Sequence, residues 1–249
     1  MKLITFLRFV KQNLFRVNWL KTVYLNFKML PFKQALCLPV LVGWRTEFRN
    51  IGGKIIFDEG LKLHPGVITL NIQNGPVATR HEHFIVNVTG IILVHGLEVH
   101  FFVGMTLWVK GCLELGGNNV FGSNSILVCT KNISVGYFMG CSWNCEIYDT
   151  NFHFFRDLVS GKIIKRHGKV HIGNNTFIGN GSIIGKGTYL DDGCVVANFS
   201  LVNRSFKREG KNLLIGGNPA QVLMTDFTQI KENKLFNGRV ETELAKEYD

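Results

Sequence analysis

The residues best suited to acid–base chemistry gather in one short stretch, DTNFHFFRDLVSGKIIKRHGK, which spans residues 149–169. An imidazole with a pKa near ~6.5 is largely unprotonated at neutral pH, so His153 could accept a proton from a hydroxyl group. Asp149 lies four residues upstream and could orient that ring or hold a substrate, but a turn-capping carboxylate is an equally good interpretation. We interpret His167 and His171 as solvated or packing residues.

The sequence that follows this stretch repeats every six residues. From Lys169 to Asn203 an aliphatic residue occupies every sixth position without a break: Ile172, Ile178, Ile184, Leu190, Val196 and Val202. A small or β-branched residue stands two places before each, and Gly, Asp, Ala or Asn follows. A hexad repeat predicts a parallel β-helix with three hexads in each triangular coil. The aliphatic residue would point inward, and the residue after it would take a tight turn with positive φ.

A looser six-residue step runs from Ile91 to Ile133 and then jumps by two to Val135. The repeat is lost between Ile147 and Ile172, which predicts a loop at 150–169 that leaves the coils, and such loops commonly carry function. The chain then divides into a basic amphipathic helical segment (1–50), a β-helix domain (51–224) and a helical tail (225–249).

The positive charge of the chain is concentrated at its N-terminal end. The net charge is +10, and residues 1–50 hold nine Lys and Arg residues against Glu47. Leu3, Phe6, Val10 and Leu14 stand near helical spacing, which predicts a cationic amphipathic helix within residues 1–30. It could pack on the end of the β-helix, or lie on an anionic bilayer. Nucleic acid is disfavoured because no nucleic-acid motif follows.

The cysteines show no CxxC pair and no zinc-finger spacing, so we interpret them as reduced thiols of a cytoplasmic protein. No signal peptide is evident because Arg8 and Lys11 interrupt the apolar run, and no stretch approaches the ~20 apolar residues of a membrane span. The six cysteines are Cys37, Cys112, Cys129, Cys141, Cys145 and Cys194.

Three motifs together point to a family: the hexads, the DTNFH that opens the predicted loop, and the closing GGNPAQVL. With them the chain resembles the hexapeptide-repeat acyltransferases over roughly residues 100–224, and most of all the galactoside, maltose and capsular polysaccharide O-acetyltransferases. The earlier MLPFKQALCLPVLVGW resembles the entry segment of the capsular members. The resemblance implies a left-handed parallel β-helix, here with an N-terminal amphipathic helical segment and a short C-terminal helix (Glu241 to Tyr248).

The resemblance also implies an enzyme that transfers acetyl from acetyl-CoA to a hydroxyl of a saccharide, in capsular or other surface polysaccharide synthesis. His153 matches the histidine that acts as general base in that family, and Asp149 is a second catalytic candidate. Asn151 stands where relatives often have Asp, which puts a two-carboxylate role in doubt.

For the donor, the resemblance places coenzyme A along a groove between coils. The matching positions are Asn180 and Asn198, followed by Asn203 and Arg204, which replace a Thr-Lys pair and keep a cation for a phosphate. Phe177 stands where relatives commonly have Trp. Gln221 and Met224 replace residues that are often basic in relatives. Three cations earlier in the chain could substitute for them or could form a solvated loop: Lys207, Arg208 and Lys211. No metal is expected.

Two other function classes were weighed. His95 and His100, with His81 or His83, are similar to the metal histidines of β-helix carbonic anhydrases, a site that needs three imidazoles around an open zinc position. Surface or core histidines in strands are the better account. A β-helix scaffold without catalysis, which binds sugar or a partner, is the other alternative. His153 and Arg204 together argue against it.

As in the family, we expect a homotrimer whose active sites lie between subunits, with the 150s loop reaching across. The basic N-terminus suggests a lipid-linked saccharide acceptor and peripheral contact with the inner face of the membrane through residues 1–30. The sequence leaves open the sugar and hydroxyl, O- or N-acylation, and the length of the acyl chain.

Overall fold

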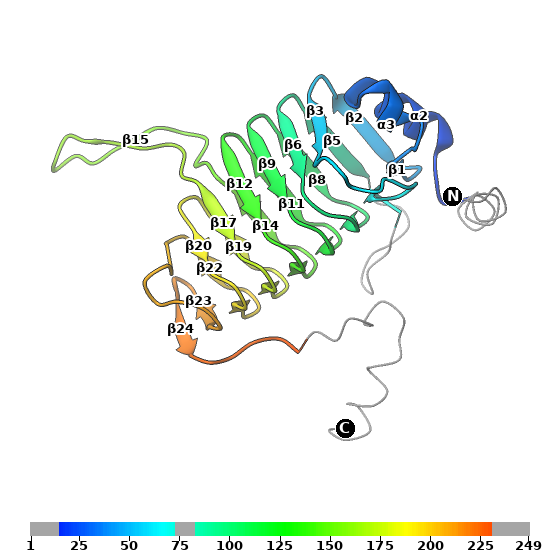
Figure 1. Ribbon diagram of the computed structural model, residues 1–249. Helices are drawn as coiled ribbons and strands as arrows, with labels where there is room; N and C mark the ends of the chain where they lie inside the picture. Colours follow the sequence, from blue (N-terminus) through cyan, green and yellow to red (C-terminus); the bar gives the residue numbers. More distant parts are fainter. Residues whose placement is uncertain (1–14, 73–82, 231–249) are drawn as a thin grey trace.

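The computed structural model describes residues 15–72 and 83–230 of the chain. In these residues the chain winds in successive coils, and each full coil adds one strand to each of three sheets (Figure 1). The fold is the left-handed parallel β-helix that the sequence predicts. The predicted C-terminal helix lies outside the described residues.

Three faces make up the prism, and their strands are parallel except for the last pair of the largest face, β23 and β24. The nine-stranded face consists, in spatial order, of β1 (Val40–Val42), β4 (Ile68–Leu70), β7 (Val99–Phe101), β10 (Asn119–Phe121), β13 (Gly140–Cys141), β18 (Phe177–Ile178), β21 (Val195–Val196), β23 (Leu214–Gly217) and β24 (Ala220–Met224). The seven-stranded face consists of β2 (Thr46–Asn50), β5 (Phe84–Val88), β8 (Thr106–Val109), β11 (Ile126–Cys129), β14 (Glu146–Tyr148), β19 (Ile183–Ile184) and β22 (Leu201–Val202). The six-stranded face consists of β3 (Lys54–Phe57), β6 (Ile91–Val94), β9 (Cys112–Leu115), β12 (Asn132–Val135), β17 (Val170–Ile172) and β20 (Tyr189–Leu190).

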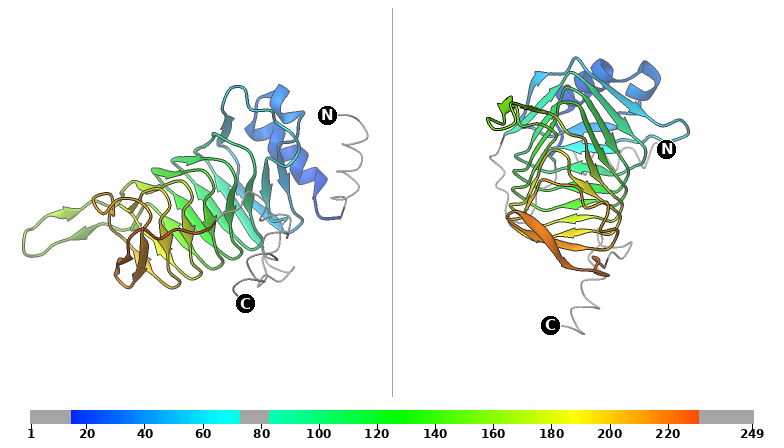
Figure 2. Two further views of the ribbon diagram at one scale, coloured as in Figure 1. Left: turned by 60° about the horizontal axis from the view of Figure 1, so that its bottom comes forward. Right: turned by 90° about the vertical axis from the view of Figure 1, so that its left-hand side faces the viewer.

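The solenoid begins at Val40, so the predicted boundary at residue 51 falls inside the first coil. Within residues 15–39 stand two helices, α2 (Trp19–Met29) and α3 (Phe32–Ala35), which lie at one end of the prism (Figure 2, left). The Asn18 side chain caps α2 by accepting from the Lys21 amide, and α2 stops before Pro31, which cannot continue a helix from its preceding residue. Neither helix of the described residues has the length and apolar character that crossing a membrane requires.

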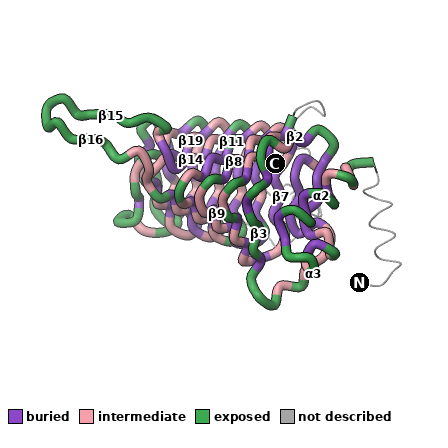
Figure 3. The backbone as a smooth tube through the Cα atoms, turned by 90° about the horizontal axis from the view of Figure 1, so that it is seen from above, coloured by how far each residue is buried: buried purple, intermediate pink, exposed green. Residues whose placement is uncertain are grey.

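The hexad pattern predicts the interior of the prism correctly. All six aliphatic residues from Ile172 to Val202 are completely buried, and the small residues two places before them are buried as well. Their side chains form one continuous core along the prism axis, which the buried residues trace in Figure 3. Phe101 and Phe121 stack within it at 4.6 Å between ring centroids.

Coil length explains where the hexads are strict and where they are loose. In the middle of the prism Cys141 pairs with Phe121, 20 residues earlier, whereas Val196 pairs with Ile178, 18 residues earlier. Only the 18-residue coil is three hexads long. A 20-residue coil is two residues longer than three hexads, as where Val135 pairs with Leu115, and this accounts for the jump in register near Val135.

The glycines that follow the aliphatic residues have a different role from the predicted one. Positive φ occurs two residues further on, for example at Asn175 (53°) and Gly181 (68°). At Gly173 an added Cβ would lie 2.6 Å from the backbone of Asp191 in the next coil, and at Gly179 it would meet the backbone and side chain of Asn198. These glycines are therefore required because adjacent coils approach closely, not because of a tight turn.

Helix α2 closes the open edge of the nine-stranded face. The Asn26 side chain donates to the carbonyl of Val40 and accepts from its amide, and the Thr22 hydroxyl accepts from the amide of Val42. These two side chains supply β1 with the partners that a preceding strand would give, and so protect an edge that could pair with another chain.

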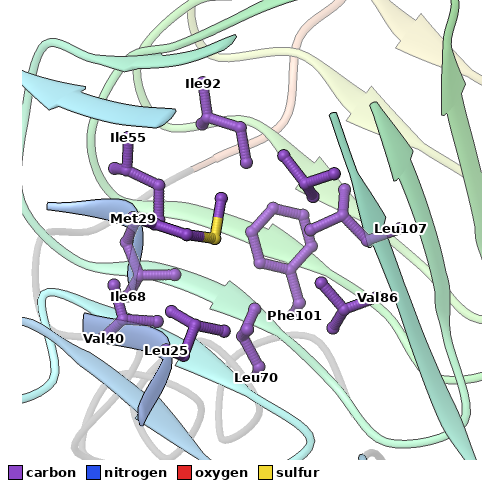
Figure 4. A pocket seen from close by; sticks show the side chains of 11 residues that line it. Leu25, Met29, Val40, Ile55, Ile68, Leu70, Val86, Ile92, Phe101 and Leu107 are labelled. Carbon is purple, nitrogen blue, oxygen red and sulfur yellow. The ribbon is translucent and has the colours of Figure 1, made fainter. Parts of the chain in front are cut away.

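The apolar residues of the same helix face cover the interior. Leu25 and Met29 point into the first coils, where a small apolar cavity of about 20 Å³ lies between them and Phe101 (Figure 4). That volume is close to the space of one water molecule, and the cavity lining is apolar, so it is a packing gap rather than a binding site.

Leu25→Ala will enlarge this gap because the Leu25 side chain is buried beneath α2. We expect the free energy of unfolding to fall by about 2–5 kcal/mol, measured by denaturant titration. Leu20→Ala is the matched control on the same helix, since Leu20 is 86% exposed and its truncation should change the free energy by less than about 0.5 kcal/mol. Equal effects of the two substitutions would show that α2 does not seal the core.

Candidate active site

The predicted loop at 150–169 is an antiparallel hairpin that stands away from the prism (Figures 1 and 3). Its strands are β15 (Phe155–Arg156) and β16 (Ile163–Ile164), and an Asp157 carboxylate that accepts from the Val159 and Ser160 amides orders the tip. Leu158 and Val159 at the tip are 90% and 99% exposed. The hairpin is therefore ordered, yet its apolar end has no partner among the residues that the structure describes.

Asp149 lies at the corner where the hairpin leaves the coils, and its side chain is completely buried. One carboxylate oxygen accepts from the amide and the hydroxyl of Thr130, at 2.8 and 2.7 Å. The other accepts from the amides of Lys131 and Asn132, at 2.6 and 2.7 Å. The carboxylate thus binds the corner of the preceding coil, and this geometry favours the capping interpretation over contact with the His153 ring.

A chain of hydrogen bonds continues from Asp149 to the returning strand of the hairpin. Because the Thr130 hydroxyl donates to the carboxylate, it accepts from Nδ1 of His167 at 2.9 Å. Nε2 of His167 then accepts from Nε of Arg166 at 3.0 Å, and the Arg166 guanidinium lies over the ring of Phe154 at 4.8 Å. Both nitrogens of His167 are engaged, so this imidazole is a structural link and not a free base.

His153 occupies the other side of the hairpin base, and its side chain is exposed. The residue before it, Phe152, has a φ of 60°, an unusual value that is held by a hydrogen bond from its amide to the Thr150 hydroxyl at 3.0 Å and by ring contact with Trp108. Within residues 15–72 and 83–230, no side chain bonds to the His153 ring. The imidazole is therefore held at a fixed place on the backbone with its nitrogens available.

The predicted donor-binding residues fall on two different edges of the prism. Asn203 and Arg204 directly follow β22 of the seven-stranded face, the same face whose strand β14 ends beside Asp149. Asn180 and Asn198 stand two residues after β18 and β21 of the nine-stranded face, one coil apart. Within one chain Asn203 and Arg204 lie on the edge of the prism from which the hairpin leaves, whereas Asn180 and Asn198 lie on a different edge.

Sequence reasoning missed a cation at the hairpin corner, Lys186. Its ammonium group donates to the carbonyl of Lys165. Lys186 stands 18 residues, or one coil, before Arg204, and this spacing is the sequence signal that could have identified it. Arg204 itself donates to Glu209 at 2.6 Å, which lowers the pKa of that carboxyl, and its guanidinium lies over the Phe206 ring. Two cations in adjacent coils make this corner suited to an anionic ligand.

The other candidate residues have packing roles. Nδ1 of His95 contacts the Asp58 carboxylate at 2.9 Å, and Nδ1 of His100 contacts the Thr69 hydroxyl at 2.9 Å. His81 lies outside the described residues. The six cysteines are free thiols, four of them buried, and burial raises the pKa of Cys129 to about 12. His171 stacks on Tyr189, and burial lowers its pKa.

Comparison with known proteins agrees with this geometry. Residues 169–204 match the family described as bacterial transferase hexapeptide (six repeats). The matched stretch begins at the last residue of the hairpin segment and runs to Arg204.

Three further proteins match over most of the chain. An uncharacterized 24.8 kDa protein in the cps region of Klebsiella pneumoniae is 29% identical over 205 residues, which are 81% of this chain and 86% of that protein. The crystal structure of the polySia-specific acetyltransferase NeuO aligns with a TM-score of 0.51 at 15% identity, over 83% of this chain and 88% of NeuO. AntD, an N-acyltransferase from Bacillus cereus in complex with dTDP and 3-hydroxybutyryl-CoA, aligns with a TM-score of 0.45 at 16% identity, over 84% and 87% of the two chains.

Asp149→Asn will loosen the hairpin corner because an amide has one acceptor oxygen where the carboxylate uses two. We expect the free energy of unfolding to fall by about 2–4 kcal/mol, since buried hydrogen bonds to a charged group are lost. Asp157→Asn at the exposed hairpin tip is the matched control and should leave the unfolding transition in place. A tolerated Asp149→Asn would refute the capping role.

Proposed function

We propose that the chain is an O-acetyltransferase that transfers acetyl from acetyl-CoA to a hydroxyl of a saccharide. The observation that carries the proposal is the position of His153, an exposed imidazole on a fixed backbone turn at the base of a hairpin that leaves a transferase hexapeptide repeat. Of the two histidines in that hairpin, His153 alone has available ring nitrogens, because those of His167 are engaged.

In the proposed reaction His153 is the general base. Its imidazole accepts the hydroxyl proton as the hydroxyl oxygen attacks the thioester carbonyl carbon, the carbon–sulfur bond breaks, and the proton passes to the departing sulfur. The thioester is already activated, so no acyl-enzyme is needed. Asp149 acts as a positioning residue in this account, because its carboxylate fixes the corner from which the hairpin leaves.

The residues at the hairpin corner fit a coenzyme A donor. Asn203 offers an amide, and Arg204 has further N–H groups beyond the one that Glu209 occupies, which suits a phosphate. Asn180 and Asn198 lie on another edge, so in our proposal they approach the hairpin of a neighbouring chain in a side-by-side homotrimer. The site is then complete only between subunits.

The proposed acceptor is a saccharide of a surface polysaccharide. Support comes from the relative in the cps region of Klebsiella pneumoniae and from NeuO, a polysialic-acid acetyltransferase of similar fold. A lipid-linked acceptor, with the protein at the inner face of the membrane through residues 1–30, completes the proposal. Arg16, Lys21 and Lys28 give the described part of that segment its positive charge.

His153→Ala should lower kcat by roughly 10²–10⁴-fold, because proton transfer by a positioned base contributes a factor of that size. Thioester consumption with acetyl-CoA and a panel of free and lipid-linked saccharides measures it. His95→Ala is the control, since His95 contacts Asp58 far from the hairpin. Full activity of His153→Ala would rule out its role as base, and absence of donor binding would favour a scaffold.

The homotrimer predicts a mass three times the 28.1 kDa of one chain by light scattering at multiple angles. Replacing the exposed tip residues, Leu158→Ser with Val159→Ser, should lower that mass, because the hairpin would lose its apolar contact with the neighbour. Ile126→Ser on the seven-stranded face is the control substitution. A monomeric wild-type protein would contradict the side-by-side assembly.

A further inference from the structure

Helix α2 is apolar on two opposite sides. One side faces the prism with Leu25 and Met29, and also carries the Asn26 side chain that pairs with β1. The opposite side carries Leu20, which is 86% exposed, together with Tyr24 and Phe27 at helical spacing. A surface helix normally presents polar residues to water, so the exposed side is not explained by the fold.

The apolar surface continues beyond α2. We define the outer patch as the exposed apolar residues on and around this helix: Phe15, Leu20, Val23, Tyr24, Phe27, Phe32, Leu36 and Trp44. Leu20, Val23, Tyr24 and Phe27 belong to α2 and Phe32 belongs to α3, and both helices lie at the same end of the prism (Figures 2 and 3). Exposed apolar residues gathered in one part of a surface commonly mark an interaction site.

Contacts within the outer patch and with the neighbouring Phe48 hold its side chains in place. Phe27 and Phe32 pack edge to face at 5.6 Å between ring centroids, and Tyr24 contacts Phe48 at 6.3 Å. The Trp44 indole donates to the carbonyl of Phe15 at 3.1 Å while its ring stays exposed. Tyr and Trp rings with one polar atom are the side chains that favour the boundary between lipid and water.

The charge around the outer patch is positive. Residues 15–50 contain six Lys and Arg residues, among them the exposed Arg16, Lys28 and Lys33. They contain one acidic residue, Glu47, which pairs with Arg49 at 3.1 Å. A second copy of the same face is therefore a poor partner, because pairing about a two-fold axis would bring like charges together. An anionic surface is the complementary one.

We propose that the outer patch docks on an anionic lipid bilayer, with the apolar side of α2 at the level of the headgroups and the flanking Lys and Arg side chains among the lipid phosphates. This inference names the surface that makes the membrane contact suggested for residues 1–30 and rests on that part of the proposed function. It does not depend on acyl transfer. The exposed side of α2 has both features that membrane binding needs, because apolar area and basic charge act together at the bilayer interface.

Vesicle flotation of the full-length protein, without donor or acceptor, tests the proposal. We expect binding to vesicles of phosphatidylcholine and phosphatidylglycerol in equal parts, weaker binding to phosphatidylcholine alone, and a decrease with added salt. Leu20→Ser with Phe27→Ser should weaken partitioning at least about 100-fold, since two large apolar side chains are lost from the contact. The control is Leu223→Ser with Ile230→Ser, two exposed apolar residues of the last strand and the segment after it, and should bind as the wild type does.

A second variant keeps the test independent of changes in packing. Lys28→Glu with Lys33→Glu alters only exposed charges and should weaken binding to the anionic vesicles at least about tenfold, with no change on phosphatidylcholine. Equal binding of the wild type and both variants would overturn the proposal. A wild-type protein that never floats would overturn it as well. In that case, a lower mass of Leu20→Ser with Phe27→Ser in light scattering would assign the patch to a second copy of the chain. A lower Tm of the same variant would assign it to the chain's own N-terminus.

Discussion

Each coil of this solenoid must lie within hydrogen-bonding distance of the coil before it, and that one constraint shapes the rest of the molecule. It permits no side chain at Gly173 and Gly179, where the next coil approaches too closely for a Cβ. It also requires a fixed coil length, because the buried aliphatic residues have to stack on one another along the prism axis. Any longer segment can leave the coils only at a corner and must return to the same corner.

The hairpin satisfies this requirement through Asp149. Its carboxylate binds the preceding coil, and the Gly168 amide donates to its carbonyl at 2.9 Å, so the leaving and returning strands meet at one residue. The hydrogen bond that His167 Nδ1 donates to the Thr130 hydroxyl then ties the returning strand to the same corner. As a result a flexible type of element, an inserted loop, presents His153 from a defined position. Stability of the corner and placement of the base are thus parts of one arrangement.

The same constraint explains which features the sequence could predict. The hexads from Ile172 to Val202 determine burial by their period alone, so the fold and the extruded loop could be predicted. For Asp149 the sequence left capping and catalytic roles equally open, because its partners Thr130 to Asn132 lie in the preceding coil, at a distance that no local pattern encodes. The glycine at position 173 was misread for the same reason, since the clash is with Asp191 in the next coil. The start of the solenoid at Val40 was missed because the first coils carry no strict hexad.

Binding of acetyl-CoA to the full-length protein tests the account most directly, and isothermal titration calorimetry measures it without knowledge of the acceptor. The account predicts saturable binding of one donor per chain, and affinity reduced roughly tenfold by Arg204→Ala, the loss expected when one charge-assisted phosphate contact is removed. No binding of acetyl-CoA, in protein that is folded by circular dichroism, would contradict the proposed function and leave a β-helix scaffold as the better description.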